Sequence, residues 1–469
     1  MIRSCLAGSV FLFAASLPLV AEETQASRGR PNVLIIVADD LGYHDLGFQG
    51  STEIPTPHLD RLAAVSVRCT SGYVSHPFCS PTRAGLLTGR YQHRFGHENN
   101  PAWLPESTVE GLPLDQITLS QLLQSVGYWT GAVGKWHLGA HPQFHPLRRG
   151  FDEYFGILGG GHQYFPGDRG GVEYTIPLNR NGQDEAQTAY LTDQFGEEAA
   201  SFVKRHANAE RPWFLYLAFN APHTPLQAPA DWLDKLASIA DTNRRTYAAM
   251  VCSMDAAIGR VLGQLDATGQ RDNTLVFFVS DNGGPDLRFR NLGNFTDNSP
   301  LRGAKGQVYE GGIRVPFLVS WPARLNAGVY DQPVSSLDFL PTAAAVARAV
   351  PPADRILDGV DLVPYLTGVR SGAPHARLFW RSLGPQGNHA VREGTWKFVR
   401  NRGGPPELYD LSTDLGETQN LAEQRPERVA HFTEVIAEWE RGTIPPAFEG
   451  AGARKPSPKK ASQKAAKKR

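Results

Sequence analysis

Short, uninterrupted runs of aliphatic and aromatic residues alternate along this chain with longer segments in which apolar positions recur every three or four residues. Residues 33–37 and 275–279 are runs of the first kind, which are typical of strands buried on both faces of a sheet. Residues 118–126 and 244–265 are segments of the second kind and predict amphipathic helices. This alternation predicts an α/β fold in which helices cover both faces of a mixed, mainly parallel sheet.

Polar residues stand directly behind the predicted strands. Asp39 and Asp40 follow the first run, and Asp281 and Asn282 follow the second. Because ligands bind outside the carboxyl ends of the strands in open α/β sheets, we expect these side chains to converge. Any one of these clusters alone is more typical of a turn, since Asp and Asn side chains often hydrogen-bond to nearby backbone.

Two further runs, at residues 128–133 and 213–219, end in the same way. The first leads into Lys135 and His137, and the second leads into His223. A histidine in such a loop is usually a half-buried structural residue. The combination of these cations with carboxylates at four strand ends is harder to explain by packing, and it predicts one functional site.

The pattern divides the chain into two units. Residues 31–372 carry the strand and helix alternation and are predicted to form the larger, catalytic domain, within which residues 154–184 are expected to be a long irregular insertion. Residues 373–450 are predicted to form a small antiparallel subdomain. Its expected strands span residues 377–381, 389–399 and 407–411, and its closing helix spans residues 426–441.

The first residues resemble an export signal. Residues 1–21 combine Arg3, an apolar stretch at 6–20 and Ala21, which is typical of a cleaved signal peptide, and residues 22–30 are a short linker. A membrane anchor is the alternative, but the stretch is short and Pro18 interrupts it. Since no later segment is long and apolar enough to span a bilayer, we expect an exported protein, periplasmic or secreted.

Residues 451–469 form a basic tail that is expected to be disordered. From residue 454 onward eight residues are basic and none is acidic, and the whole chain is formally neutral, so the remainder carries a net charge of −8. The tail is either an electrostatic tether to an anionic surface or polysaccharide, or a solvated extension without a fixed role. The acidic body argues against nucleic-acid binding.

Four cysteines are present. Cys5 belongs to the predicted signal peptide, while Cys69 and Cys252 either pair in an oxidising compartment or remain as two free buried thiols. The sequence contains no Cys-x-x-Cys pair, which argues against a structural zinc site.

The fourth cysteine opens the most specific motif of the chain. Residues 79–83 read Cys-Ser-Pro-Thr-Arg and continue as Ala-Gly-Leu-Leu-Thr-Gly-Arg to position 90. This stretch resembles the signature of the type I, formylglycine-dependent sulfatases, a family of the alkaline phosphatase superfamily that includes arylsulfatases and N-acetylgalactosamine-6-sulfatases. Residues 300–316 and 408–411 are similar to further stretches of that family. The resemblance implies the alkaline-phosphatase-like fold and hydrolysis of a sulfate ester, and Thr82 departs from the serine that is frequent there.

The resemblance also implies the cofactors. Cys79 would be oxidised by a maturase, before folding, to a formylglycine aldehyde whose hydrate attacks sulfur. The metal ligands would be Asp39, Asp40, Asp281, Asn282 and the modified residue 79. Because all are hard oxygen donors, Ca²⁺ is the expected ion and Mg²⁺ the alternative. A helix predicted to begin directly after Cys79 would turn free backbone N–H groups toward an anion.

The catalytic roles follow from the same resemblance. Arg83 and Lys135 would hold the hydrate, and Lys305 and His223 would grip the sulfate. His223 would protonate the leaving alcohol, aided by Lys305, and His137 would take the proton from the second hydroxyl to release sulfate.

The substrate is expected to be a sulfated carbohydrate of the algal galactan or glycosaminoglycan type. The candidate sugar contacts are His97, His162 and Arg288, in the segments 97–100, 162–165 and 288–291, although each could equally be a structural loop residue. Two alternatives stay open. One is a phosphodiesterase or phosphonate monoester hydrolase with the same motif, and the other is a sulfated-glycan-binding protein in which Cys79 stays a thiol.

Overall fold

The computed structural model of this protein describes residues 29–167, 173–288 and 293–450. The predicted signal peptide, most of the predicted linker and the predicted basic tail lie outside the described residues. Within the described residues, no helix is long and apolar enough to cross a membrane.

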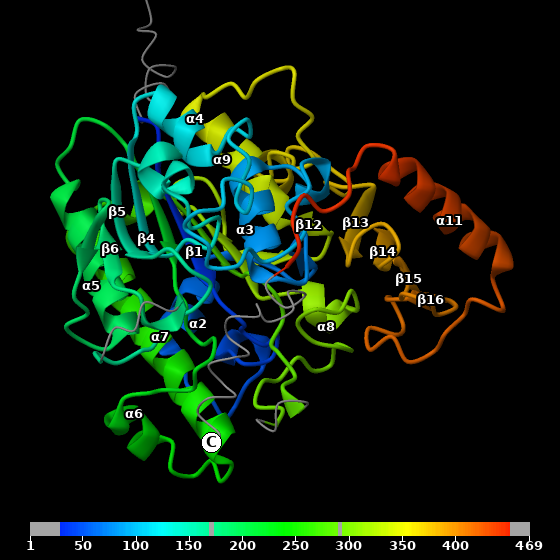
Figure 1. Cartoon of the computed structure of the whole chain (residues 1–469), viewed down its shortest axis with the longest axis horizontal. Helices are drawn as coiled ribbons and strands as arrows, with labels where there is room; N and C mark the ends of the chain where they lie inside the picture. The colour runs from blue at the N-terminus through cyan, green and yellow to red at the C-terminus, as the bar shows by residue number, and fades with distance from the viewer. Residues whose placement is uncertain (1–28, 168–172, 289–292, 451–469) are drawn as a thin grey trace, which may run out of the picture.

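A ten-stranded sheet runs through the larger part of the molecule (Figure 1). Its strands, in spatial order, are β11 (Gly328–Tyr330), β2 (Val67–Cys69), β10 (Phe317–Ser320), β9 (Thr274–Ser280), β1 (Asn32–Ala38), β8 (Trp213–Ala218), β4 (Trp129–Lys135), β5 (Glu153–Ile157), β6 (Leu178–Arg180) and β7 (Gln183–Glu185). The central strands from β9 to β5 are parallel, whereas β10, β6 and β7 pair antiparallel with their neighbours. The prediction of a mixed, mainly parallel sheet is confirmed.

Strand β1 shows why a continuous aliphatic run was the right signal for a central strand. Val33, Ile35 and Val37 pack into one hydrophobic core, and the alternating Leu34 and Ile36 pack into a second core on the opposite face. The first face is covered by α3 (Cys79–Thr88), α4 (Leu119–Ser125) and α9 (Phe339–Ala347). The second is covered by α2 (Pro57–Ala64), α5 (Leu191–Arg205) and α7 (Thr242–Ala267).

The two predicted amphipathic helices form with well-defined N-termini. Thr118 and Gln121 make a capping box at the start of α4, in which each side chain accepts from the other residue's backbone N–H. Asp241 caps α7 by accepting from Arg244 N.

The C-terminal unit is a four-stranded antiparallel sheet with one helix packed on it, as predicted. Its elements are β13 (Arg377–Ser382), β14 (Asn388–Glu393), β15 (Trp396–Arg400), β16 (Pro406–Asp410) and α11 (Pro426–Glu440). The prediction of one strand over residues 389–399 was wrong, because β14 and β15 form a hairpin. Gly394 has a φ of +59° in its turn, a conformation that glycine adopts without steric cost.

The prediction of an irregular insertion at 154–184 also needs correction. Of its described residues, the end of β5 and the strands β6 and β7 belong to the edge of the large sheet. Asn181 and Gly182, both with positive φ, connect β6 to β7 as a two-residue turn. These short strands lack an apolar run, since they lie at an edge rather than in the buried centre.

The remaining helices and strands are short: β3 (Gly72–Tyr73), β12 (Val334–Ser335), α6 (Ala230–Lys235), α8 (Glu310–Ile313) and α10 (Val363–Leu366). Cys69 and Cys252 are both free and buried, so of the two expectations for this pair the structure has the free thiols.

Candidate active site

The polar residues behind the central strands meet at one edge of the large sheet. Asp39 and Asp40 follow β1, and Asp281 and Asn282 follow β9. The two strands are parallel neighbours in register, with Ala38 opposite Ser280, so their carboxyl ends lie side by side. Potential ligand atoms of Asp39, Asp40, Cys79 and Asp281 all lie within 4.8 Å of one another, and all four residues are buried.

Cys79 is the first residue of α3 and is only 1% exposed. Its Sγ lies 3.5 Å from Asp39 Oδ1 and 3.3 Å from Lys305 Nζ. Burial, reinforced by the charge of Asp281, raises the pKa of the Cys79 thiol well above its ordinary value. The unmodified residue is therefore a neutral thiol at neutral pH and a weak nucleophile.

Three cations are interleaved with the carboxylates. Lys135 Nζ lies 2.5 Å from Asp39 Oδ2, and Lys305 Nζ lies 2.5 Å from Asp40 Oδ1. The guanidinium of Arg83 donates twice to Asp281 Oδ2, at 2.7 and 3.0 Å. Lys135 and Arg83 are fully buried, whereas the Lys305 side chain is 14% exposed and marks the side on which the cluster reaches solvent.

The cations shift the pKa values of the two carboxylates Asp281 and Asp40 to different extents. Burial and the neighbouring charge of Asp39 raise the pKa of Asp281, even though Arg83 pairs with it. Asp40 shows the opposite balance: burial alone would raise its pKa, but Lys305 and His223 lower it. A divalent cation among these groups would offset the repulsion between the carboxylates.

The donor set fits a hard cation. Asn282 Oδ1 is buried with no hydrogen-bond partner among the described residues, while its Nδ2 donates to Asp40 Oδ1 at 2.7 Å. An orphaned carbonyl oxygen beside three carboxylates is the arrangement that Ca²⁺ or Mg²⁺ coordinates, since both ions prefer oxygen ligands.

Backbone strain is concentrated at the same place. Asp40 and His137 have φ values of +67° and +57°, a left-handed conformation that non-glycine residues rarely adopt. Gly283 is required for a different reason, because a Cβ at this position would lie 1.8 Å from Gly311 O. This close approach brings the loop after β9 against the stretch that carries Lys305.

The two histidines have different surroundings. His137 Nδ1 is buried and has no hydrogen-bond partner among the described residues, and burial holds the pKa of the ring well below its ordinary value. His223 donates from Nδ1 to Thr224 O at 2.6 Å, which leaves Nε2, 3.6 Å from Asp40 Oδ2, as its free nitrogen. Burial lowers the pKa of His223 to about 3, although Asp40 opposes that change.

Two of the three predicted sugar contacts are internal residues. His97 is fully buried, with its ring nitrogens 2.7 Å from Ser80 Oγ and 3.1 Å from Gly111 O. His162 is also fully buried, with its ring nitrogens at 2.7 Å from the carbonyl oxygens of two loop residues. Both rings support loops from inside, and their role in sugar binding stays a prediction.

Arg288 is exposed, and its guanidinium pairs with Asp286 at 2.5 Å. Its role in sugar binding stays a prediction, and residues 289–291 of that segment lie outside the described residues.

Three residues near the cluster were missed by sequence reasoning. The Tyr174 ring lies 6.4 Å from the His223 ring, and Glu173 accepts from Gly160 N at 2.7 Å. Gly160 itself packs so closely on His137 that an added Cβ would lie 2.5 Å from His137 Nε2. No local sequence pattern identifies Glu173 or Tyr174 as neighbours of the active site.

Asn220 is the third, and its signal was present. It lies two residues after the end of β8, and its side-chain Oδ1 and Nδ2 are buried without a hydrogen-bond partner among the described residues. Its position behind a central strand is the same signal that identified Asp39 and Asp281.

This chain is similar to known proteins in both sequence and structure. Residues 31–349 match the family model described as Sulfatase. N-acetylgalactosamine-6-sulfatase of Canis lupus familiaris is 38% identical over 72% of this chain and 66% of that protein, so the chain spans about two thirds of its length. Arylsulfatase A of Bos taurus is 35% identical over 92% of this chain and 90% of that protein.

Solved structures extend the comparison. Ps i-CgsB, crystallised in complex with k-i-k-neocarrahexaose, superposes with a TM-score of 0.85 at 37% identity, covering 93% of this chain and 97% of that chain. The phosphonate monoester hydrolase SpPMH from Silicibacter pomeroyi superposes with a TM-score of 0.65 at 21% identity over 88% of this chain and 96% of that one, which shows a common fold alone.

Proposed function

Since the chain belongs to the sulfatase family, the sulfuric ester hydrolases, we propose that it removes sulfate from a sulfated carbohydrate by means of a formylglycine derived from Cys79. The observation that carries the proposal is the placement of Cys79 in the first turn of α3, between the Asp39 carboxylate and the Lys305 ammonium. The raised pKa of the unmodified thiol makes a thiolate nucleophile unsuitable, whereas an aldehyde hydrate supplies an oxygen nucleophile with a second hydroxyl.

Asp39, Asp40, Asp281 and Asn282 would hold the divalent cation. When bound, this ion would polarise the sulfate and orient the nucleophile.

Arg83 and Lys135 position the reacting residue. Arg83 is fixed from two sides, because it donates to the Asp281 carboxylate and also to Lys135 O at 3.0 Å. Lys135 is the last residue of β4 and is held by Asp39. Both charges are therefore set before substrate arrives, and such preorganised groups stabilise a developing negative charge most effectively.

Lys305 and His223 would bind the sulfate, and the support is that both side chains are partly exposed at the cluster. His223 keeps its Nδ1 proton on Thr224 O, so Nε2 is the atom that exchanges a proton with substrate. An anionic sulfate beside Nε2 raises the pKa of the ring from its low value in the free enzyme. His223 then protonates the departing alcohol oxygen.

His137 is the base that this arrangement favours. Its low pKa keeps the ring neutral at neutral pH, and its unpartnered Nδ1 is available to accept a proton.

A sulfated galactan oligosaccharide is the substrate we favour. The support is the similarity, at 37% identity over nearly the whole chain, to a protein crystallised with k-i-k-neocarrahexaose. Tyr174 beside His223 offers an aromatic surface next to the sulfate-binding side chains, a common feature of sugar sites.

Mass spectrometry of the peptide that contains Cys79 tests the proposal, using protein from a host that matures a control sulfatase. We expect the aldehyde mass, together with sulfate release from neocarrageenan oligosaccharides. An unmodified thiol with no sulfate release would contradict the proposal and support a glycan-binding protein instead. Faster turnover of a phosphonate monoester or a phosphate diester than of any sulfate ester would support a phosphonate monoester hydrolase or phosphodiesterase instead.

Export to the periplasm or the extracellular space, and conversion of Cys79 by a maturase before folding, complete the proposal. Both rest on the sequence: the apolar stretch at residues 6–20 and the Cys-Ser-Pro-Thr-Arg motif.

A further inference from the structure

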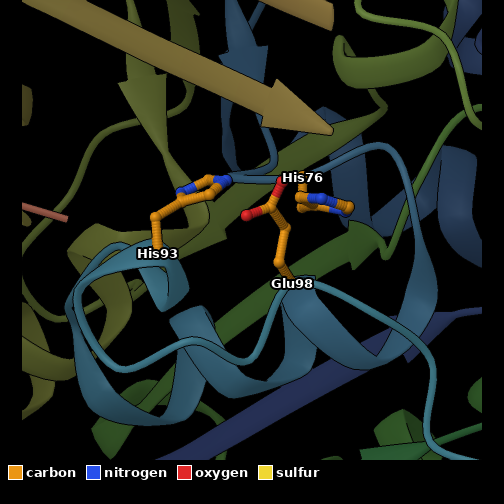
Figure 2. Close-up of side chains that lie close together, drawn as sticks. All are labelled: His76, His93 and Glu98. Atoms are coloured by element: carbon orange, nitrogen blue, oxygen red, sulfur yellow. The ribbon is translucent and has the colours of Figure 1, made fainter. Parts of the chain in front are cut away.

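A second cluster of metal-binding side chains lies outside the active site (Figure 2). It consists of His76, in the loop before α3, His93, in the short 3-10 helix Gln92–Arg94, and Glu98, in the following loop. One ligand atom of each residue lies within 4.8 Å of the others, and each residue is at most 1% exposed. Figure 2 shows the two rings on either side of the Glu98 carboxylate.

Three of the four ring nitrogens in this cluster have no hydrogen-bond partner among the described residues. Neither nitrogen of His76 has a hydrogen-bond partner among the described residues, and neither has Nδ1 of His93. Buried polar atoms are nearly always hydrogen-bonded, and leaving one unsatisfied costs about 1–3 kcal/mol. A neutral imidazole keeps a proton on one nitrogen, so each of the two rings offers one lone pair, and both lone pairs lie close to the Glu98 carboxylate.

One contact already orients a ring for this purpose. His93 Nε2 lies 2.9 Å from Arg381 O and can only donate there, which leaves the Nδ1 lone pair free. A backbone carbonyl that fixes the tautomer of a histidine in this way is a common second partner of metal-binding histidines.

We propose that His76, His93 and Glu98 bind a structural Zn²⁺ ion. Two imidazole nitrogens and one carboxylate oxygen form a ligand set that zinc prefers, and a water molecule would complete a tetrahedral shell. The active-site cluster differs, since it offers oxygen ligands and suits calcium or magnesium. The lack of a Cys-x-x-Cys pair therefore excluded only one type of zinc site.

The charges around the cluster are compatible with a cation. Arg381 is the nearest fixed positive charge, but it is paired with Glu98 at 2.7 Å and with Glu440 at 2.8 Å, so this group of three carries a net charge of −1. Burial lowers the pKa of His76 and of His93, the latter to about 3, so both rings are neutral ligands at neutral pH. Glu98 Oε1 accepts only from Gly384 N, which leaves it a lone pair for the ion.

All three ligands come from the catalytic domain, but the C-terminal unit covers them. Trp439 of α11 contacts the His93 ring edge-on, with centroids 5.1 Å apart, and Arg381 belongs to β13. His76 O also accepts from Thr82 Oγ1, inside the motif that begins with Cys79. The ion would thus tie the loop before Cys79 to residues 93–98, on which the C-terminal unit packs.

The test uses the full mature chain with the substitution Asp281→Asn, which disables the active-site metal cluster. After removal of metals and addition of Zn²⁺ alone, we expect one equivalent of zinc per chain after gel filtration. X-ray absorption at the zinc edge should show two imidazole ligands. No retained zinc, or zinc without imidazole scattering, would overturn the proposal, and this result needs no change to the cluster itself.

Substitutions sharpen the assignment. In the same background, His76→Gln and His93→Gln should each lose the zinc equivalent and the rise in Tm that zinc produces. His389→Gln is the matched control, because His389 is equally buried at the same interface but pairs with Glu440, and it should keep both. Zinc retention by all three variants would place the ion elsewhere and overturn the assignment.

Discussion

The active site and the junction between the two units are both buried clusters of charge, but they differ in completeness. At the junction, Lys397 Nζ donates to Glu310 Oε1 at 2.8 Å and to Glu417 Oε1 at 3.3 Å, and Tyr73 donates to Glu310 Oε2 at 2.6 Å. Arg314 pairs with Glu310 as well. No buried side-chain nitrogen or oxygen of these residues lacks a hydrogen-bond partner among the described residues, so the junction needs no ligand to complete it.

The active site, in contrast, contains buried polar atoms without hydrogen-bond partners among the described residues. Asn282 Oδ1 and His137 Nδ1 have no hydrogen-bond partner among the described residues. Both clusters alternate acids with bases, so charge balance alone does not distinguish structure from function. The orphaned polar atoms do, because folding has not satisfied them and a ligand can.

The largest expected effect separates the clusters most clearly. Cys79→Ala should lower kcat/KM for an aryl sulfate by about 10⁴-fold or more, because it removes the nucleophile, while Tm changes little. Cys252→Ala removes another buried thiol and should leave kcat/KM unchanged. Substantial turnover by a purified Cys79→Ala protein would show that the reaction does not depend on this residue.

A substitution at the junction should lower stability rather than activity. Lys397→Met leaves Glu310 and Glu417 buried without their shared cation, and it should lower the free energy of unfolding by about 3–5 kcal/mol. Urea unfolding measures the loss, and kcat of the folded fraction should be unchanged. A loss below about 1 kcal/mol would mean that the junction tolerates uncompensated charge.

Lys305→Met is the matching change in the active site. It should lower kcat by about 10²- to 10³-fold, because one preorganised charge facing the sulfate is lost. Its partial exposure limits the structural cost, so Tm should change far less than in Lys397→Met. If the Lys305→Met protein were unstable but fully active when folded, Lys305 would be a structural residue like Lys397.

Addition of Ca²⁺ should act on the active site and not on the junction. In chelated protein, Ca²⁺ at about 100 times its Kd should stabilise the native state by about 2.7 kcal/mol, which differential scanning calorimetry detects as a rise in Tm. Asp281→Asn should abolish this rise, and Lys397→Met should not. An equal rise in Tm in both variants would show that Asp281 is not a Ca²⁺ ligand.

The smallest effect concerns a second contact of the C-terminal unit. Burial alone would lower the pKa of His375, but its ion pair with Asp338 at 2.8 Å raises it. This pair should therefore stabilise the fold fully below the unfolded pKa of about 6.5, and its contribution should be lost as pH rises through the higher folded pKa. His375→Asn should flatten that part of the pH dependence of urea unfolding, and an unchanged profile would rule out the pair as its source.

Much of the fold and the placement of the candidate site followed from local patterns. The run at residues 33–37 predicted a central strand because a strand flanked on both faces must be apolar at successive positions. Asp39, Asp281 and Lys135 could be placed together because parallel neighbours expose their carboxyl ends at one edge. Their chemical roles remain predictions for the experiments above.

Two local signals were overlooked. The Asn-Gly pair at 181–182 and Gly394 mark hairpin turns, and both are visible without a structure. Strands β6 and β7, at one side of the large sheet, carry few apolar residues, so hydrophobic pattern alone assigned them to a loop, and it joined β14 and β15 into a single strand.

Local sequence was thus enough to establish the α/β architecture, the Cys79 motif and the strand ends that surround it, because each depends on residues a few positions apart. Only the folded chain decided which polar side chains face a ligand and which face the interior. His97 and His162 are buried, and Lys397 meets Glu310 across 87 residues of sequence. Burial and long-range pairing depend on how distant segments pack, and no short pattern contains that information.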